Sequence, residues 1–251
     1  MPFDADETRF SNLRFAREGG VLEMTLHTRG GEALWGIAED GLHNELGVAF
    51  AEIARDRETK VVILTGTGTS FIAGMDPQSR PTETSRSAIW ARMHREGVAL
   101  LENLLAIPVP VIAAVNGPAL IHAEVAALSD IVLASETAEF ADVAHVAGGV
   151  VPGDGVQTAW LTLLGPNRGR YFLLTGQRIG AQEAKALGVV GEVLAADQLL
   201  PRARELAQGL AKLPATMLRH TRAVMVRDLR RRMADELSLG LALEALAATE
   251  Q

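Results

Sequence analysis

The chain has 251 residues, of which 48% are hydrophobic, and this is enough apolar sequence to build one sizeable core. Its formal net charge of −7 argues against a nucleic-acid-binding surface. The absence of cysteine excludes disulfides, thiolate metal sites and a cysteine nucleophile, and it agrees with a cytoplasmic location.

Neither the N-terminal segment nor the apolar runs resemble targeting or membrane segments. The first ten residues, MPFDADETRF, are acidic and lack the apolar core of a signal peptide. The longest apolar runs, such as IPVPVIAAV at 107–115, are too short to cross a bilayer. We therefore expect a soluble, cytoplasmic protein with no membrane partner.

The first half of the chain predicts strands alternating with helices. Apolar and polar residues alternate on both sides of Gly19-Gly20, a pattern typical of a β-hairpin. The continuous apolar run at 60–64 indicates a strand buried on both faces. The expected elements are strands at 13–17 and 21–27, a helix at 39–55, a strand at 60–64, and a helix at 88–106 that ends before Pro108.

The second half begins with the same alternation and then becomes helical. Expected here are strands at 111–115 and 131–134 around a short helix at 121–128, helices at 156–164, 167–175 and 181–187, a strand at 189–194, and helices at 199–213 and 216–246. The last helix carries a basic run at 227–232, interpreted as a solvated or intersubunit face. This order predicts an α/β fold whose helical tail docks on its own chain or on a neighbour.

One stretch, residues 115–155, gathers the residues best suited to proton transfer. His122, Glu124, His145 and Asp154 lie there beside short Gly/Pro loops. Histidine is suited to general acid–base chemistry because its ordinary pKa is about 6.5. A His/His/Asp metal site is an alternative use of the same residues, but we expect no metal.

Several motifs at family spacing resemble the crotonase (enoyl-CoA hydratase/isomerase) superfamily. They are KVVILTGTGTSFIAGMD at 60–76, IPVPVIAAVNGPA at 107–119, SDIVLAS at 129–135, FADV and VPGDG between 140 and 155, and LLTGQRIGAQEAKALGVVGEV at 173–193. The resemblance implies a spiral of ββα repeats over 1–195 and a C-terminal helical trimerisation region over 196–251. It also implies a homotrimer or a dimer of trimers.

The departures from the family pattern bear on the reaction. Enzymes of this superfamily build an oxyanion hole from two backbone N–H groups, and the first loop is intact at Ala73. The second loop, LIHAE at 120–124, has side chains where the family has glycine. Of the two glutamates of hydratases, the first matches Glu124, whereas the second falls at Ala144 or His145. A thioester oxyanion hole and a two-glutamate hydratase are both in doubt.

A narrower branch is a better match, the β-diketone hydrolases of the 6-oxocamphor hydrolase type. These enzymes cleave a C–C bond of cyclic β-diketones without coenzyme A, which implies no cofactor. VPGDG, NRGRYFLLTGQ and LSLGLALEALAA also match this branch. The positions that carry the resemblance are Trp35, His43, His122, Glu124, His145, Asp154 and Glu244.

The resemblance gives each of these residues an expected role. His145 is the expected general base, and Asp154 would accept a hydrogen bond from its second ring nitrogen, as the carboxylate does in a Ser-His-Asp triad. His122 and the indole N–H of Trp35 would stabilise the oxyanion or enolate. Glu244 would orient His122 or the water, or reprotonate the enolate. The expected substrate contacts are His43, Glu124, Ala73 and Met75.

Three functional hypotheses remain open on the sequence. The first is hydrolysis of a small, apolar, cyclic β-diketone by water attack. The second is an acyl-CoA enzyme of the hydratase/isomerase type that reuses Glu124 and the Ala73 amide and therefore binds CoA. The third is a non-catalytic binding or scaffold subunit, whose properties would not depend on His145 or Asp154.

Overall fold

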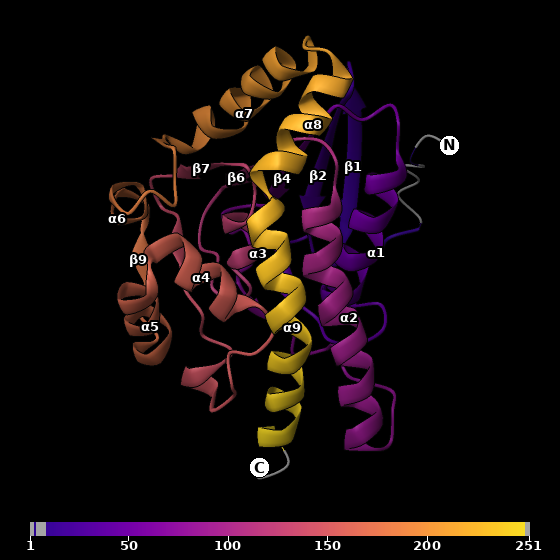
Figure 1. Ribbon diagram of the computed structural model, residues 1–251, viewed down its shortest axis with the longest axis vertical. Coiled ribbons are helices and arrows are strands. Elements are labelled where there is room, and N and C mark those ends of the chain that lie inside the picture. Colours follow the sequence, from indigo (N-terminus) through magenta and orange to yellow (C-terminus); the bar gives the residue numbers. More distant parts are fainter. Residues whose placement is uncertain (1–2, 4–8, 249–251) are drawn as a thin grey trace.

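The computed structural model describes residue 3 and residues 9–248, and its centre is a six-stranded sheet (Figure 1). In spatial order the strands are β1 (Leu13–Glu18), β2 (Val21–Leu26), β4 (Val61–Gly66), β6 (Val111–Val115), β7 (Ile131–Ser135) and β10 (Glu192–Leu194). The β1–β2 hairpin is antiparallel, and the other neighbours in this sheet are parallel. The hairpin expected around Gly19-Gly20 is confirmed.

The central strands are apolar on both sides because the sheet is covered on both sides. On β4, Val62 and Leu64 belong to the main core, whereas Val61 and Ile63 point to the other face. There they pack against α7 (Ala196–Ala211), which contacts β2, β4, β6 and β7. This two-sided burial explains the continuous apolar runs, since a half-exposed strand would alternate. It also shows that the C-terminal helices dock on their own chain.

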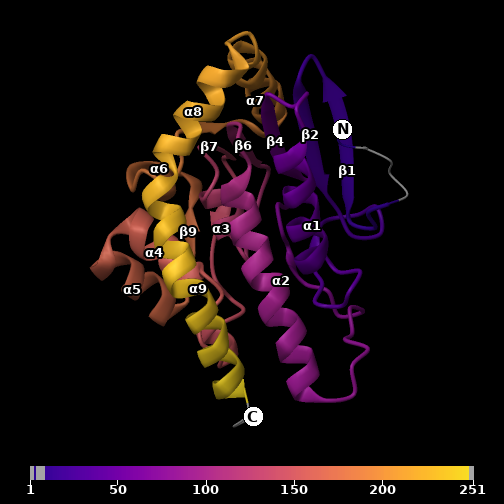
Figure 2. The ribbon, with the colours of Figure 1, turned by 45° about the vertical axis from the view of Figure 1, so that its right-hand side comes forward.

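Three helices lie side by side over the main core (Figure 2). They are α1 (Leu42–Arg55), α2 (Arg86–Ala106) and α9 (Arg227–Ala247). Helix α2 packs against α1 on one side and against α9 on the other. Residues far apart in the sequence therefore approach each other along α2, and the site described below lies in part between α2 and α9.

Short elements connect the sheet to these helices. Two small sheets are formed by β3 (Leu34–Trp35) with β5 (Gly74–Met75) and by β8 (Glu139–Phe140) with β9 (Ile179–Gly180). The remaining elements are α3 (Glu124–Ala127), a 3₁₀ turn η1 (Val146–Gly148), α4 (Val156–Leu164), α5 (Pro166–Thr175), α6 (Ala181–Ala186) and α8 (Ala215–Met225).

The prediction of a single helix at 216–246 is wrong, because the structure divides this segment at Val226 into α8 and α9. Val226 is buried and has ψ −1°, which is far from the helical value of about −42°. Just before it, the guanidinium of Arg222 donates to the carbonyls of Leu105 and Ile107 at the end of α2 and pairs with Asp130. We infer that this anchor holds α8 in place while α9 turns to follow α2.

Within the described part of the chain, no helix combines the length and the apolar character that crossing a bilayer requires.

Candidate active site

A cavity of about 160 Å³ lies where the loops after β3, β5 and β8 meet α2 and α9. Its apolar lining comes from Trp35, Ile37, Met75, Trp90, Met93, Ala144, Val150 and Leu241. Its polar lining comes from His43, His122, His145, Asp154 and Glu244. An apolar space with a few convergent polar groups is typical of a small-molecule site.

Five of the acid–base groups in this region form a continuous chain of hydrogen bonds and ion pairs. Asp142 Oδ1 lies 2.7 Å from Nδ1 of His145, and Nε2 of the same ring lies 3.2 Å from Asp154 Oδ2. That oxygen is also 3.3 Å from Nδ1 of His122, which lies 2.7 Å from Glu124 Oε1. Asp154 is therefore the bridge between the two imidazoles, and the structure brings the predicted His145 and Asp154 into contact.

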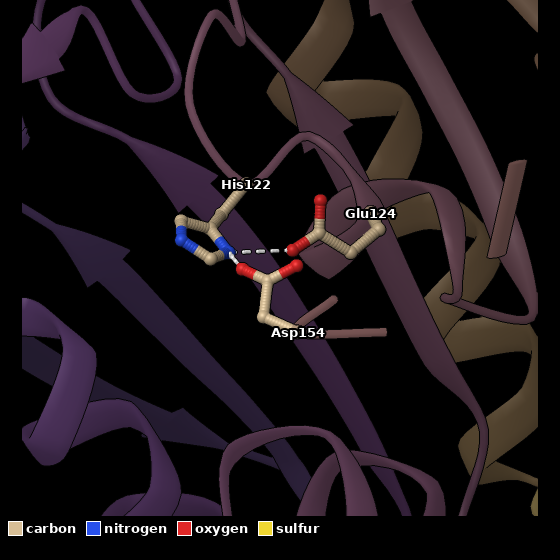
Figure 3. A group of neighbouring side chains, drawn as sticks. All are labelled: His122, Glu124 and Asp154. Carbon is tan, nitrogen blue, oxygen red and sulfur yellow. Dashed lines mark hydrogen bonds and ion pairs between the residues drawn. The ribbon is translucent and has the colours of Figure 1, made fainter. Parts of the chain in front are cut away.

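His122 is held in a backbone conformation that side chains rarely adopt. Its φ is +48°, in the left-handed region that favours glycine and that costs other residues about 1 kcal/mol or more. The ring stacks on the indole of Trp35, with ring centroids 3.9 Å apart. Figure 3 shows Nδ1 of His122 facing Glu124 and Asp154, with Nε2 on the opposite side of the ring. The turn therefore places an imidazole where the family has glycine.

Two tight turns position His145 and Asp154. The carbonyl of His145 accepts hydrogen bonds from the backbone N–H groups of Gly148 and Val150, which fold the chain around η1. Asp154 lies two residues before Val156, the first residue of α4, and its Oδ1 accepts from the N–H of Val156. A carboxylate is favoured at a helix N-terminus because the unpaired N–H groups there carry partial positive charge.

The neighbouring charges decide the protonation of these groups. Burial alone would lower the pKa of His145, but the charge of Asp154 and hydrogen bonds to Asp142 and Asp154 outweigh it and raise the pKa to about 12. The pKa of His122 is also raised, because the charges of Asp154 and Glu124 outweigh its burial. Burial would raise the pKa of Asp154, but the two imidazoles hold it well below its usual range.

Glu244, on α9, has the opposite character. It is 6% exposed, and its Oε2 has no hydrogen-bond partner among the described residues. Burial, with the charge of Asp154 as the second cause, raises its pKa to about 8. Glu244 is therefore a neutral carboxylic acid at pH 7. Burial likewise raises the pKa of Glu124, whose Oε2 also lacks a partner.

Of the four expected substrate contacts, two line the cavity and two do not. His43 and Met75 line the cavity, whereas Glu124 and Ala73 are not among its lining residues. Glu124 is fully buried behind His122, and the N–H of Ala73 donates to the carbonyl of Ala33 over 2.9 Å. The Ala73 amide is thus already engaged and does not serve as an oxyanion donor in this arrangement.

Several residues of the site were not predicted from the sequence. Asp142 lies three residues before His145, and this spacing is the signal that could have indicated a hydrogen-bonded pair in a turn. Glu96, which lies 3.2 Å from Nδ1 of His43, gives no such signal, because its contact comes from the packing of α2 on α1. The missed apolar lining residues on α2 and α9 are Trp90, Met93 and Leu241.

His122, Glu124 and Asp154 are also the group that comes nearest to a metal site within the described residues (Figure 3). One ligand atom from each lies within 4.8 Å of the others. The 2.7 Å between His122 Nδ1 and Glu124 Oε1 is a hydrogen-bond distance. Ligand atoms about 2.1 Å from a tetrahedral ion would lie roughly 3.4 Å apart. The short distance between His122 Nδ1 and Glu124 Oε1 therefore favours a proton shared by these two atoms over a metal ion bound between them.

Known proteins similar to this chain include hydrolases and acyl-CoA enzymes. The structure of a β-diketone hydrolase from the cyanobacterium Anabaena sp. PCC 7120, bound to (S)-3-oxocyclohexyl acetic acid, is 42% identical, with a TM-score of 0.92 over 100% of this chain and 99% of that one. An enoyl-CoA hydratase/isomerase from Mycobacterium paratuberculosis is 28% identical, with a TM-score of 0.86 over 94% and 93% of the two chains.

Similarity to sequences of named function extends over much of the chain. Carnitinyl-CoA dehydratases from Shigella flexneri and from Escherichia coli K12 are each 32% identical over 201 residues, which is 79% of this chain and 74% of theirs. The sequence model of the enoyl-CoA hydratase/isomerase family matches residues 16–247. The resemblance to the crotonase superfamily and the α/β fold, both predicted from the sequence motifs, are confirmed. The chain belongs to the enoyl-CoA hydratase/isomerase family, within the crotonase superfamily.

Proposed function

We propose that the protein hydrolyses a C–C bond of a small, apolar, cyclic β-diketone without coenzyme A. The observation that carries the proposal is the placement of three histidines, an aspartate and a neutral glutamic acid around one small cavity with apolar walls. Similarity to a β-diketone hydrolase over the whole chain supports the same reading.

The reaction makes three demands on these side chains. Water must lose a proton as its oxygen attacks one carbonyl carbon, and the resulting oxyanion must be stabilised. The C–C bond to the carbon between the two carbonyls then breaks, and its electron pair forms an enolate on the second carbonyl. Finally that carbon takes up a proton, so that one diketone and one water give one keto acid.

Oxyanion stabilisation fits His122, because its Nδ1 faces Glu124 and Asp154 while its Nε2 lies on the opposite side of the ring (Figure 3). The two carboxylates raise the pKa of this ring, and a preorganised donor of this kind is worth about 10²–10³ in rate. A ring with a pKa near 12 holds its proton at neutral pH, so this environment does not suit the role of general base expected for His145. Trp35 stacks on His122 and fixes the plane of that ring.

Protonation of the enolate carbon fits Glu244. Its carboxyl group lines the cavity and is neutral below pH 8, so it can donate a proton at neutral pH. The pKa also lies close to the working pH, which is the condition for efficient proton transfer in both directions.

An acyl-CoA reaction is the second candidate, because the carnitinyl-CoA dehydratases share 32% identity with the chain. That reaction would use Glu124 as the acid–base group and predicts measurable affinity for CoA. In the structure Glu124 lies behind His122, outside the cavity lining, and this geometry favours the diketone.

The test is a panel of cyclic 1,3-diketones assayed beside crotonyl-CoA, following the loss of diketone and enoyl absorbance. We expect diketone cleavage without added CoA, abolished by Asp154→Asn because both imidazoles lose their shared counter-ion. The matched control is Asp228→Asn, the same change at an exposed position in the first turn of α9. Turnover of crotonyl-CoA alone would overturn the proposal.

A further inference from the structure

His43 differs from the other two cavity histidines in having only one carboxylate partner. It is the second residue of α1, it is 4% exposed, and its Nδ1 lies 3.2 Å from Glu96 Oε2 on α2. The hydrogen bond of His43 to Glu96 is made through Nδ1, whereas Nε2 lies 3.6 Å from the position of a Cβ added to Gly97 of α2. At His145, by contrast, both ring nitrogens face carboxylates.

Glu96 pairs with a buried arginine on the same helix. Arg92 donates through Nη1 to Glu96 Oε2 over 2.7 Å, and its Nε donates to Glu83. Arg92 is 5% exposed, and a buried guanidinium requires such charged partners. The order of contacts is therefore Glu83–Arg92–Glu96–His43, running from the loop before α2 to the cavity.

This order of contacts selects one form of the His43 ring. A carboxylate beside Nδ1 accepts a hydrogen bond from it, so a neutral ring carries its proton on Nδ1 and a lone pair on Nε2. Burial lowers the pKa of His43, the hydrogen bond to Glu96 opposes this, and the positive charge of His122 adds to it. The other ionisable groups near the ring are Asp154 before α4 and Glu244 on α9, and Arg92 on α2 contacts Glu96.

We propose that His43 is the general base that takes the proton from the attacking water, and that Glu96 is the residue that positions it. The inference rests on the proposed hydrolysis and names the base within it. The water proton moves to Nε2 of His43 as the water oxygen bonds to the carbonyl carbon. The C–C bond then breaks, the enolate carbon takes its proton from Glu244, and the proton on His43 leaves to solvent as Glu244 is reprotonated.

The pair has the same logic as the carboxylate and histidine of a Ser-His-Asp triad, with water in place of serine. Glu96 holds the tautomer and stabilises the imidazolium that forms, whereas Arg92 holds the Glu96 side chain in place through its hydrogen bond to Oε2. His43 and His122 then have different roles, since a neutral His43 ring accepts a proton at Nε2 while the His122 ring donates a hydrogen bond to the oxyanion through its own Nε2.

The kinetic test compares variants on the best diketone of the panel. We expect His43→Gln, whose amide can still donate to Glu96, to lower kcat by about 10²–10⁴ with little change in KM. Glu96→Gln should lower kcat less and move the acidic limb of the pH profile to lower pH, because Glu96 raises the pKa of His43. The control is Glu102→Gln, the same change at an exposed position of α2.

A raised KM with unchanged kcat in His43→Gln would make His43 a substrate-binding residue only and would overturn the inference. An unmoved pH profile in Glu96→Gln would remove Glu96 from the positioning role. A second measurement, ¹⁵N NMR of the histidine rings at pH 7, does not depend on turnover. It should show His43 neutral with its proton on Nδ1, and a protonated His43 would overturn the inference even in an active enzyme.

These outcomes are distinct from a failure of the proposed function. If the wild-type protein cleaves no diketone, the substrate class is rejected, and His43 then has no hydrolytic water to activate. If it cleaves diketones and His43→Gln matches the Glu102→Gln control in kcat, only the choice of base is wrong.

Discussion

Glu244 is the side chain at which activity and stability are expected to oppose each other. Its pKa is about 8 in the folded protein, against an ordinary value of 4.5. Between pH 4.5 and 8 the carboxyl ionises in the unfolded chain but stays protonated in the folded one, so stability falls as pH rises through this window. A neutral amide at this position escapes that loss.

We therefore predict that Glu244→Gln raises the free energy of unfolding above pH 8 by about 1–3 kcal/mol, while it removes diketone cleavage. Near pH 4.5 the two proteins should be almost equally stable. Urea unfolding at several pH values tests this, and a variant that is equally destabilised at every pH would contradict the assigned protonation of Glu244.

The same carboxyl group sets the alkaline limb of the activity. Because the acid form of Glu244 donates the proton to carbon, kcat should fall as pH rises through about 8. His145, with a pKa of about 12, should not titrate in this range. A pH profile of kcat measures the limb, and constant activity up to pH 10 would exclude Glu244 as the acid.

At the scale of single residues, the sequence predicted the members of the site better than their contacts. The resemblance identified Trp35, His122, His145 and Asp154, and the structure places them around one cavity. It did not predict that Asp154 bridges two imidazoles, because this depends on the exact position of two turns. The protonation of each histidine follows from such contacts and was therefore not predictable either.

At the scale of elements, the contact between α9 and the loop before α4 depends on two glycines. A Cβ on Gly240 would lie 2.0 Å from the carbonyl oxygen of Gly153, and a Cβ on Gly153 would lie 2.1 Å from that of Gly240. The two backbones touch directly, which fixes α9, and with it Glu244, against the loop that carries Asp154.

We predict that Gly240→Ala lowers the free energy of unfolding by about 2 kcal/mol or more and reduces activity, because the helix must move away from the loop. The matched variant is Gly209→Ala on α7, where nothing lies within 4 Å of the added methyl group. It should stabilise the protein by about 0.4–1 kcal/mol. Thermal unfolding of both distinguishes them, and equal melting temperatures would refute the close contact.

Helices and strands could be predicted from the sequence where the pattern of apolar residues is long enough to show a helical or strand period. The strand at 111–115 and the helix at 156–164 have the expected bounds, and α2 differs from its expectation by two residues at its start. The two-residue strands β3 and β5 carry no period, yet β3 supplies Trp35. The division at Val226 was missed because the buried Arg222 that accompanies it is a tertiary contact.

At the scale of the whole molecule, large apolar side chains remain exposed on the outer helices. They include Tyr171 and Leu174 on α5, Val224 and Met225 on α8, and Leu239, Leu243 and Leu246 on α9. Apolar side chains gathered on a surface are often covered by a partner. In the expected homotrimer or dimer of trimers, formed through region 196–251, these side chains would be covered by neighbouring subunits.

Sedimentation velocity tests this expectation. The wild-type protein should sediment as a trimer or hexamer, and the double variant Val224→Asp/Met225→Asp, which places charge on the C-terminal region, should sediment as a smaller species. Leu174→Asp, outside that region, should leave the assembly unchanged. A monomeric wild-type protein would contradict the predicted assembly, and dissociation by Leu174→Asp alone would move the interface to α5.

Mass spectrometry of the product formed in H₂¹⁸O tests whether the protein adds water across a C–C bond of a cyclic β-diketone. We expect an open-chain keto acid that has the mass of the diketone plus one molecule of labelled water, with the new oxygen in the carboxylate. This product should form without CoA and should be absent from Asp154→Asn. An unchanged diketone beside hydrated crotonyl-CoA would exclude the proposed hydrolysis and assign the protein to acyl-CoA chemistry.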